Sequence, residues 1–207
     1  MIDEAIPSAL WGSLSTLLLT ALALMGSPGP AVISVAAMSA AYGPRRAIPF
    51  LSGIVGGTTT VLLIVASGLT GALLALPGIG PALVLAAAMY ILYLAYRIAT
   101  APPVSEPDSG ATPPSFAGGF FLAIANPKAY AAIAAVFASA TLIRGSLAWD
   151  TAMKVALLTV MVVSVNIVWL FVGAALSRAL RDPVKARVAN MLFAAALVVA
   201  VVLAVLP

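Results

Sequence analysis

Cysteine and histidine are both absent from this chain of 207 residues, and only 8% of its residues are charged. Without cysteine there are no disulfides and no thiol redox chemistry, and without either residue the usual zinc and haem ligands are missing. We therefore expect no metal site and no cofactor. The ten basic residues outnumber the six acidic ones, but nine of them fall in short connections between apolar runs. That distribution is typical of membrane topology and argues against nucleic acid as a partner.

Apolar residues make up 63% of the chain, and the mean hydropathy is +1.17. A soluble domain could not cover so much apolar surface with so few charges, so the composition predicts an all-α integral membrane protein. Charged residues and helix breakers divide the sequence into six apolar segments, each expected to be a transmembrane helix. These segments are residues 10–42, 48–76, 82–96, 116–143, 155–177 and 188–206.

A proline-rich stretch separates two sets of three segments. Residues 101–114 contain five prolines, which predicts an extended cytoplasmic linker. Residues 1–100 then form a first three-helix half, and residues 115–207 form a second. Because each half has an odd number of spans, the halves must face opposite ways, and we expect a 3+3 inverted-topology repeat.

The basic residues predict the orientation in the membrane. The first, third and fifth connections carry seven of them, and the opposite side carries two, together with Trp149 and Asp150 in a loop before residue 155. Since cytoplasmic loops are rich in Lys and Arg, we expect a multi-pass protein of the inner (plasma) membrane with both termini outside. The seven residues are Arg45, Arg46, Arg97, Arg178, Arg181, Lys185 and Arg187, and the two are Arg144 and Lys154.

Helix breakers interrupt the first and the fourth segments. They are the runs Ser27-Pro28-Gly29-Pro30 and Asn126-Pro127-Lys128, and Pro127 follows Pro28 by 99 positions. In both runs a residue favoured as an N-cap precedes proline, which is favoured at the first position of a helix. We therefore expect Ser27 and Asn126 each to begin a new half-helix, so that helices 1 and 4 are broken.

The start of a half-helix attracts anions, because it presents unpaired N–H groups and the positive end of the helix dipole. Opposed halves would bring two such starts to a similar depth. The substrate site predicted from this reasoning consists of Ser27, Pro28, Gly29, Pro30, Asn126, Pro127 and Lys128, with Asn166 of the fifth segment as a further polar candidate. The alternatives are ordinary proline kinks at the breaks and an interhelical hydrogen bond at Asn166.

These residues resemble the LysE/RhtB superfamily of amino-acid exporters. The resemblance is carried by Ser27-Pro28-Gly29-Pro30, Gly43-Pro44-Arg45-Arg46, the stretch from Tyr90 to Tyr96, and Asn126-Pro127-Lys128-Ala129. It implies a LysE-type translocator, a secondary-active exporter of amino acids or related small metabolites that works by alternating access. The resemblance is also compatible with two further partners, a coupling ion and a second copy of the chain in a homodimer.

Two positions depart from the pattern that this resemblance implies. Family members usually have a polar residue, often Asn, after Pro-Gly-Pro, and many have an Asp in the fifth span, whereas this chain has Ala31 and Asn166. With no acidic residue inside an expected span, a neutral or anionic substrate is favoured over lysine or arginine. One alternative is a non-transporting protein for membrane assembly or lipid localisation. Another is an intramembrane enzyme using Ser27 with Lys128, but we expect no enzyme activity.

Overall fold

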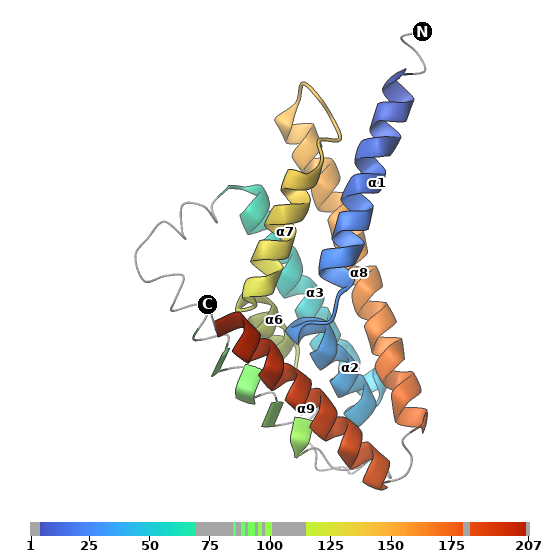
Figure 1. The fold of residues 1–207 in the computed structure, drawn as a ribbon, viewed down its shortest axis with the longest axis vertical. Helices are drawn as coiled ribbons and strands as arrows, with labels where there is room; N and C mark the ends of the chain where they lie inside the picture. The colour runs from blue at the N-terminus through green and yellow to red at the C-terminus, as the bar shows by residue number, and fades with distance from the viewer. Residues whose placement is uncertain are drawn as a thin grey trace.

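The computed structural model describes residues 5–68, 85, 88–89, 91–93, 95–96, 98–100, 115–179 and 183–205, and this part of the chain is an elongated helical bundle (Figure 1). The predicted linker at 101–114 and much of the third predicted segment lie outside the described residues. The continuous helices are α1 (Ala5–Gly26), α2 (Pro30–Tyr42), α3 (Pro44–Ala66), α6 (Phe116–Ile124), α7 (Pro127–Ser139), α8 (Leu147–Ala179) and α9 (Pro183–Val205).

Two pairs of helices are bent at short breaks, at the two positions where the sequence predicts broken helices. The bend between α1 and α2 is 59°, and the bend between α6 and α7 is 60°. By length and composition, α3 and α8 can each cross a membrane, and the described residues contain up to four spans if each bent pair is one span. A polytopic helical membrane protein is thus supported, while the six-span inverted repeat stays a prediction.

Helices α3 and α6 pack with their backbones in contact. A Cβ atom added to Gly53 would collide with the carbonyl oxygen of Phe116, and one added to Gly57 would lie 2.6 Å from the carbonyl oxygen of Phe120. On the opposing helix, a Cβ atom at Gly119 would collide with the carbonyl oxygen of Phe50. Small residues at such spacing let membrane helices approach closely. This contact fixes α6, and therefore the second break, against α3.

Helix α2 lies in the centre of the bundle, with eleven of its thirteen residues buried. On one side it packs against α8 so closely that a Cβ atom at Gly173 would collide with the carbonyl oxygen of Ala36. The hydroxyl of Ser39 donates a hydrogen bond of 2.8 Å across the same contact, to the carbonyl oxygen of Leu170. Because α2 is held on several sides, its first turn is presented to the interior of the protein.

The connection between α7 and α8 is shorter than predicted, which corrects two segment boundaries. The fourth segment was expected to end at residue 143 but ends at Ser139, and the fifth begins at Leu147 instead of residue 155. Trp149, Asp150 and Lys154, which were assigned to a loop, therefore lie in the first turns of α8. At the other end of α8, Arg178 is helical, and Lys185 and Arg187 belong to α9 and not to the preceding loop.

A buried ion pair explains the early start of α8. Oδ1 of Asp150 accepts hydrogen bonds from the backbone N–H groups of Leu142 and Ile143, at 2.6 and 2.9 Å, and its Oδ2 lies 2.8 Å from Nζ of Lys154. Lys154 also donates to the carbonyl oxygen of Phe137, at 3.0 Å. Because each charge has its partners, both residues can be helical and only 5% exposed.

Five of the basic residues at described helix ends lie at one end of the molecule. Figure 1 shows the beginnings of α3 and α9 and the end of α8 together, opposite the N-terminal end of α1 and the connection between α7 and α8. This arrangement agrees with the charge pattern used to predict the topology. Which end faces the cytoplasm stays a prediction. The residues concerned are Arg45, Arg46, Arg178, Lys185 and Arg187.

Candidate functional site

The first break differs from its sequence-based prediction at the residue that caps the new helix. Helix α2 begins at Pro30, and its N-cap is Gly29, not Ser27. The Ser27 hydroxyl instead donates to the carbonyl oxygen of Leu24, at 2.9 Å, and so helps to end α1. Because glycine has no side chain, the first turn of α2 has no side-chain cap.

The uncapped turn leaves backbone donors at the start of α2. The first hydrogen bond of this helix runs from the N–H of Ile33 to the carbonyl oxygen of Gly29, at 2.9 Å. The N–H groups of Ala31 and Val32 come before that bond, in the part of a helix where N–H groups have no partner within the helix. The positive end of the α2 dipole lies at the same place.

The second break has the predicted cap. Asn126 is the N-cap of α7, its Oδ1 accepts a hydrogen bond of 3.2 Å from the backbone N–H of Lys128, and Pro127 is at the first helical position. The carbonyl oxygen of Asn126 also accepts from the N–H of Ala129, at 3.0 Å. The first turn of α7 is therefore satisfied within the break, unlike the first turn of α2.

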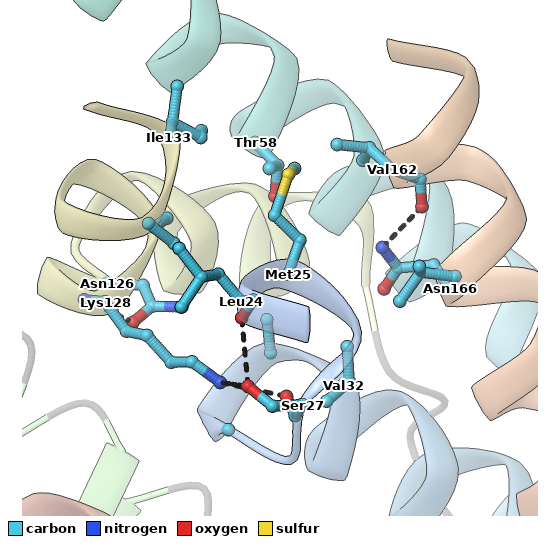
Figure 2. A pocket seen from close by; sticks show the side chains of 15 residues that line it. Leu24, Met25, Ser27, Val32, Thr58, Asn126, Lys128, Ile133, Val162 and Asn166 are labelled. Carbon is cyan, nitrogen blue, oxygen red and sulfur yellow. Dashed lines mark hydrogen bonds between the residues drawn. The ribbon is translucent and has the colours of Figure 1, made fainter. Parts of the chain in front are cut away.

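The Lys128 side chain joins the two breaks (Figure 2). Its Nζ donates to the carbonyl oxygen and the hydroxyl of Ser27, both at 2.9 Å, and to the carbonyl oxygen of Pro28, at 3.0 Å. An ammonium group has three donors, so all are in use. Gly29 permits this approach, since a Cβ atom there would lie 2.8 Å from Nζ and 2.9 Å from Cδ of Lys128. The end of α1 is thereby bonded to the start of α7.

A cavity of about 60 Å³ lies where the two breaks meet. Five of the eight residues predicted for the site line it, namely Ser27, Gly29, Asn126, Lys128 and Asn166. Of the other three, Pro28 contributes its carbonyl oxygen to Lys128, while Pro30 and Pro127 begin the helices that meet there. Sequence reasoning did not assign the remaining lining residues to the site; they are Leu24, Met25, Ala31, Val32, Thr58, Ala129, Ala132, Ile133, Val162 and Val165.

Thr58 is the polar residue among those that were missed. It follows Gly57 on α3, and Gly53 and Gly57 have the G-x-x-x-G spacing that is typical of close helix packing. Gly57 does contact α6, while the next residue along the helix faces the cavity. The close contact at Gly57 therefore did not indicate that the side chain of Thr58 lines the cavity.

Asn166 has one unsatisfied atom. The residue is 5% exposed, and its Nδ2 donates 2.9 Å to the carbonyl oxygen of Val162 on the same helix. Its Oδ1 is buried without a hydrogen-bond partner. The interhelical hydrogen bond that was the structural alternative for Asn166 is thus not formed by either atom of its amide group.

The model of the LysE type translocator family matches residues 22–206, which begin in α1 and include both breaks. This chain belongs to the LysE type translocator family. The resemblance seen in the sequence is therefore confirmed, and the translocator is a membrane transport protein of a family that is not one of enzymes. No curated protein and no solved structure matches it.

Both departures from the superfamily's pattern lie at this cavity of the translocator. Ala31 and Asn166 line it from α2 and α8, respectively. The resemblance implied a more polar residue at both positions, whereas Ala31, beside the uncapped turn of α2, is apolar and Asn166 has a neutral amide. Neither residue brings a negative charge to the site, and the backbone donors of the first break remain in place.

Lys128 is the charged residue of the translocator's cavity, and none of the fifteen described residues that line the cavity is acidic. Its three hydrogen-bond partners are neutral oxygens. The ion pair between Asp150 and Lys154 is closed on itself near the connection between α7 and α8. The cavity therefore combines an uncompensated positive charge with free backbone donors, which together suit an anionic group.

Proposed function

We propose that this translocator exports a neutral or anionic amino acid, or a related small metabolite, by secondary active transport across the inner membrane. The observation that carries the proposal is the positive charge of Lys128, which faces a cavity without an acidic residue among its described lining. A charge inside a membrane protein is costly unless it is paired. A substrate carboxylate would supply the missing negative charge.

The start of α2 supports the same substrate orientation. The N–H groups of Ala31 and Val32 precede the first helical hydrogen bond, and both residues line the cavity. A carboxylate at this turn would accept from backbone donors and lie at the positive end of the helix dipole. The start of α7 contributes less, because Asn126 already satisfies it. The anion site that we propose is therefore the first turn of α2 together with Lys128.

The bonds between the breaks bear on the transport cycle. Lys128 connects α7 to the end of α1, so a movement of one bent helix pair against the other must break its bonds to Ser27 and Pro28. A bound carboxylate can replace carbonyl oxygens as the acceptor for this ammonium group. We propose that this exchange accompanies alternating access, with an ion gradient as the driving force.

The proposal retains the 3+3 inverted repeat of residues 1–100 and 115–207, with both termini outside. Its support is the similarity of the two breaks, which have bends of 59° and 60°, each followed by a helix of 13 residues. Repeats of this kind place substrate sites at the interface of their broken helices. The cavity lies where the two breaks meet, and this position supports the proposed repeat.

Transport into inverted membrane vesicles tests the proposal. Vesicles with the translocator should accumulate at least one labelled member of a panel of neutral and acidic amino acids when a proton or sodium gradient is imposed. Lys128→Met, which keeps the length of the side chain and removes its charge, should abolish this uptake. Lys185→Met, a change of the exposed lysine of α9, is the matched control and should leave uptake unchanged.

The result against the proposal is also defined. If the wild-type protein is folded in the vesicles and accumulates no member of the panel under either gradient, the proposal is wrong. Such a result would favour the non-transporting membrane role. If uptake occurs but Lys128→Met is as active as the wild type, export stands and the role of Lys128 is wrong.

A further inference from the structure

We propose that Oδ1 of Asn166 accepts a hydrogen bond from the ammonium group of the substrate, so that the translocator selects small zwitterionic α-amino acids over carboxylates without an amine. This inference rests on the proposed function and adds a second contact and a substrate class to the same site.

The unsatisfied oxygen is the first observation behind this inference. Buried polar atoms nearly always have a hydrogen-bond partner, and an exception in a folded protein requires an explanation. The amide atom of Asn166 that faces the carbonyl oxygen of Val162 must be the donor nitrogen Nδ2, because a carbonyl oxygen can only accept a hydrogen bond. The other amide atom is therefore the oxygen Oδ1. Oδ1 is left as an acceptor on a residue that lines the cavity. Its complement is a donor, and a charged ammonium group makes stronger hydrogen bonds than a neutral donor.

The charges of the cavity favour a ligand with both signs. Lys128 and the first turn of α2 attract a carboxylate, while Asn166 offers an acceptor without a formal negative charge. A simple amine would add its positive charge to that of Lys128 with no acidic residue in the described lining to offset it. A zwitterion brings its own carboxylate to Lys128 and its ammonium group to Asn166, on a different helix, as Figure 2 shows.

The size of the cavity limits the substrate. A water-sized position needs roughly 10–15 Å³, and the cavity of about 60 Å³ therefore holds only a handful of such positions. Glycine, alanine and serine are among the smallest amino acids and need the fewest such positions. Beyond the groups already named, the lining is mainly apolar, including Met25, Ile133 and Val165. The space thus suits a small, uncharged substrate side chain.

Binding to the purified full-length translocator tests the role of Asn166. The probes are L-alanine, propionate, which lacks the amine, and ethylamine, which lacks the carboxylate, each measured by calorimetry in sodium chloride and in choline chloride. We expect alanine to bind about tenfold or more tightly than propionate, because a hydrogen bond from a charged group is worth at least that factor. Ethylamine should bind weakest.

Two variants of Asn166 separate the acceptor from packing. Asn166→Leu keeps the side-chain volume and removes the acceptor, so it should weaken alanine binding by about tenfold or more and leave propionate unchanged. Asn166→Asp keeps the acceptor and adds a negative charge. This variant should still bind alanine, and it should bind ethylamine more tightly than the wild type does. Ser164→Ala, an exposed change on the same helix, is the control and should behave as the wild type.

Each contrary outcome has a distinct meaning. If alanine and propionate bind equally well to the wild type, or Asn166→Leu leaves alanine binding unchanged, the inference is wrong and carboxylate export stands. If alanine binding requires sodium and Asn166→Leu removes only that requirement, Oδ1 binds the coupling ion instead. If neither alanine nor propionate binds, and no member of the amino-acid panel is transported, the proposed function fails together with the inference. Should Asn166→Leu not fold, the wild-type preference for alanine over propionate still decides.

Discussion

The ammonium nitrogen of Lys128 lies 2.9 Å from both the hydroxyl oxygen and the carbonyl oxygen of Ser27, a residue 101 positions earlier in the chain. This contact makes Lys128 a structural link between two broken helices as well as the charge of the cavity. Its donors satisfy carbonyl oxygens that the end of α1 leaves without helical partners. Trp169 of α8 does the same for the carbonyl oxygen of Gly26, with a hydrogen bond of 3.3 Å from its indole nitrogen.

Gly29→Ala should impair transport, because the added Cβ would lie 2.8 Å from Nζ of Lys128. The ammonium group would have to leave its position between Ser27 and Pro28, and the bond between the two breaks would weaken. We expect uptake to fall tenfold or more, because the hydrogen bonds lost by the charged ammonium group are worth about 1.5–3 kcal/mol. Gly12→Ala is the matched control, since a Cβ at Gly12 meets nothing within 4 Å. Equal uptake by both variants in vesicles would contradict this prediction.

The two breaks show how much of the site the sequence can predict. The cap at Asn126 was predicted correctly, because the side chain, the proline and the N–H group that it accepts from lie within three consecutive residues. Ser27 was predicted wrongly, because Pro28 and Pro30 offered two possible starts for the helix. Which start is used depends on the Leu24 carbonyl and on Lys128, and the lysine comes from a distant part of the chain.

Other parts of the fold depend on contacts that have no local signal. Apolar runs located both broken helices, but the boundary near residue 155 was wrong because charged residues were taken as the end of a span. The ion pair between Asp150 and Lys154 neutralises both charges and lets the helix continue. The unsatisfied oxygen of Asn166 could not be predicted either, because the neighbouring helices are distant in sequence and none of the described ones places a hydrogen-bond donor beside it.

Asp150→Asn should destabilise the protein strongly. The change removes the carboxylate that pairs with Lys154 and leaves the ammonium group buried, and removal of one partner of a buried pair costs about 3–5 kcal/mol. The double variant Asp150→Asn with Lys154→Met removes both charges and should recover part of the loss. Thermal unfolding of the purified protein measures this. A double variant that is less stable than Asp150→Asn would show that the pair's charge balance is not the reason.

Gly53→Ala should destabilise the contact between α3 and α6. The added Cβ would collide with the carbonyl oxygen of Phe116, and backbone atoms cannot move aside as side chains can. Overpacking of this kind costs about 1–3 kcal/mol or more. Gly56→Ala on the same helix is the control, because its Cβ would meet only the rings of Phe116 and Phe120, at 3.6–3.9 Å. The unfolding midpoint should fall for Gly53→Ala alone, and an equal fall for both would contradict the proposed packing.

The absence of cysteine allows the orientation to be tested with single reporters. Thr100→Cys and Thr141→Cys place the same change on exposed residues before the start of α6 and after the end of α7. The first, third and fifth connections were assigned to the cytoplasm from their seven basic residues together. A membrane-impermeant maleimide should therefore label Thr141→Cys in intact cells and Thr100→Cys only in inverted vesicles. The reverse labelling pattern would show that the orientation in the membrane is opposite to the predicted one. Export would then be measured as uptake into vesicles of the opposite orientation. Labelling of both positions from one side would mean that α6 and α7 enter and leave the membrane on the same side, and the 3+3 repeat would then be wrong.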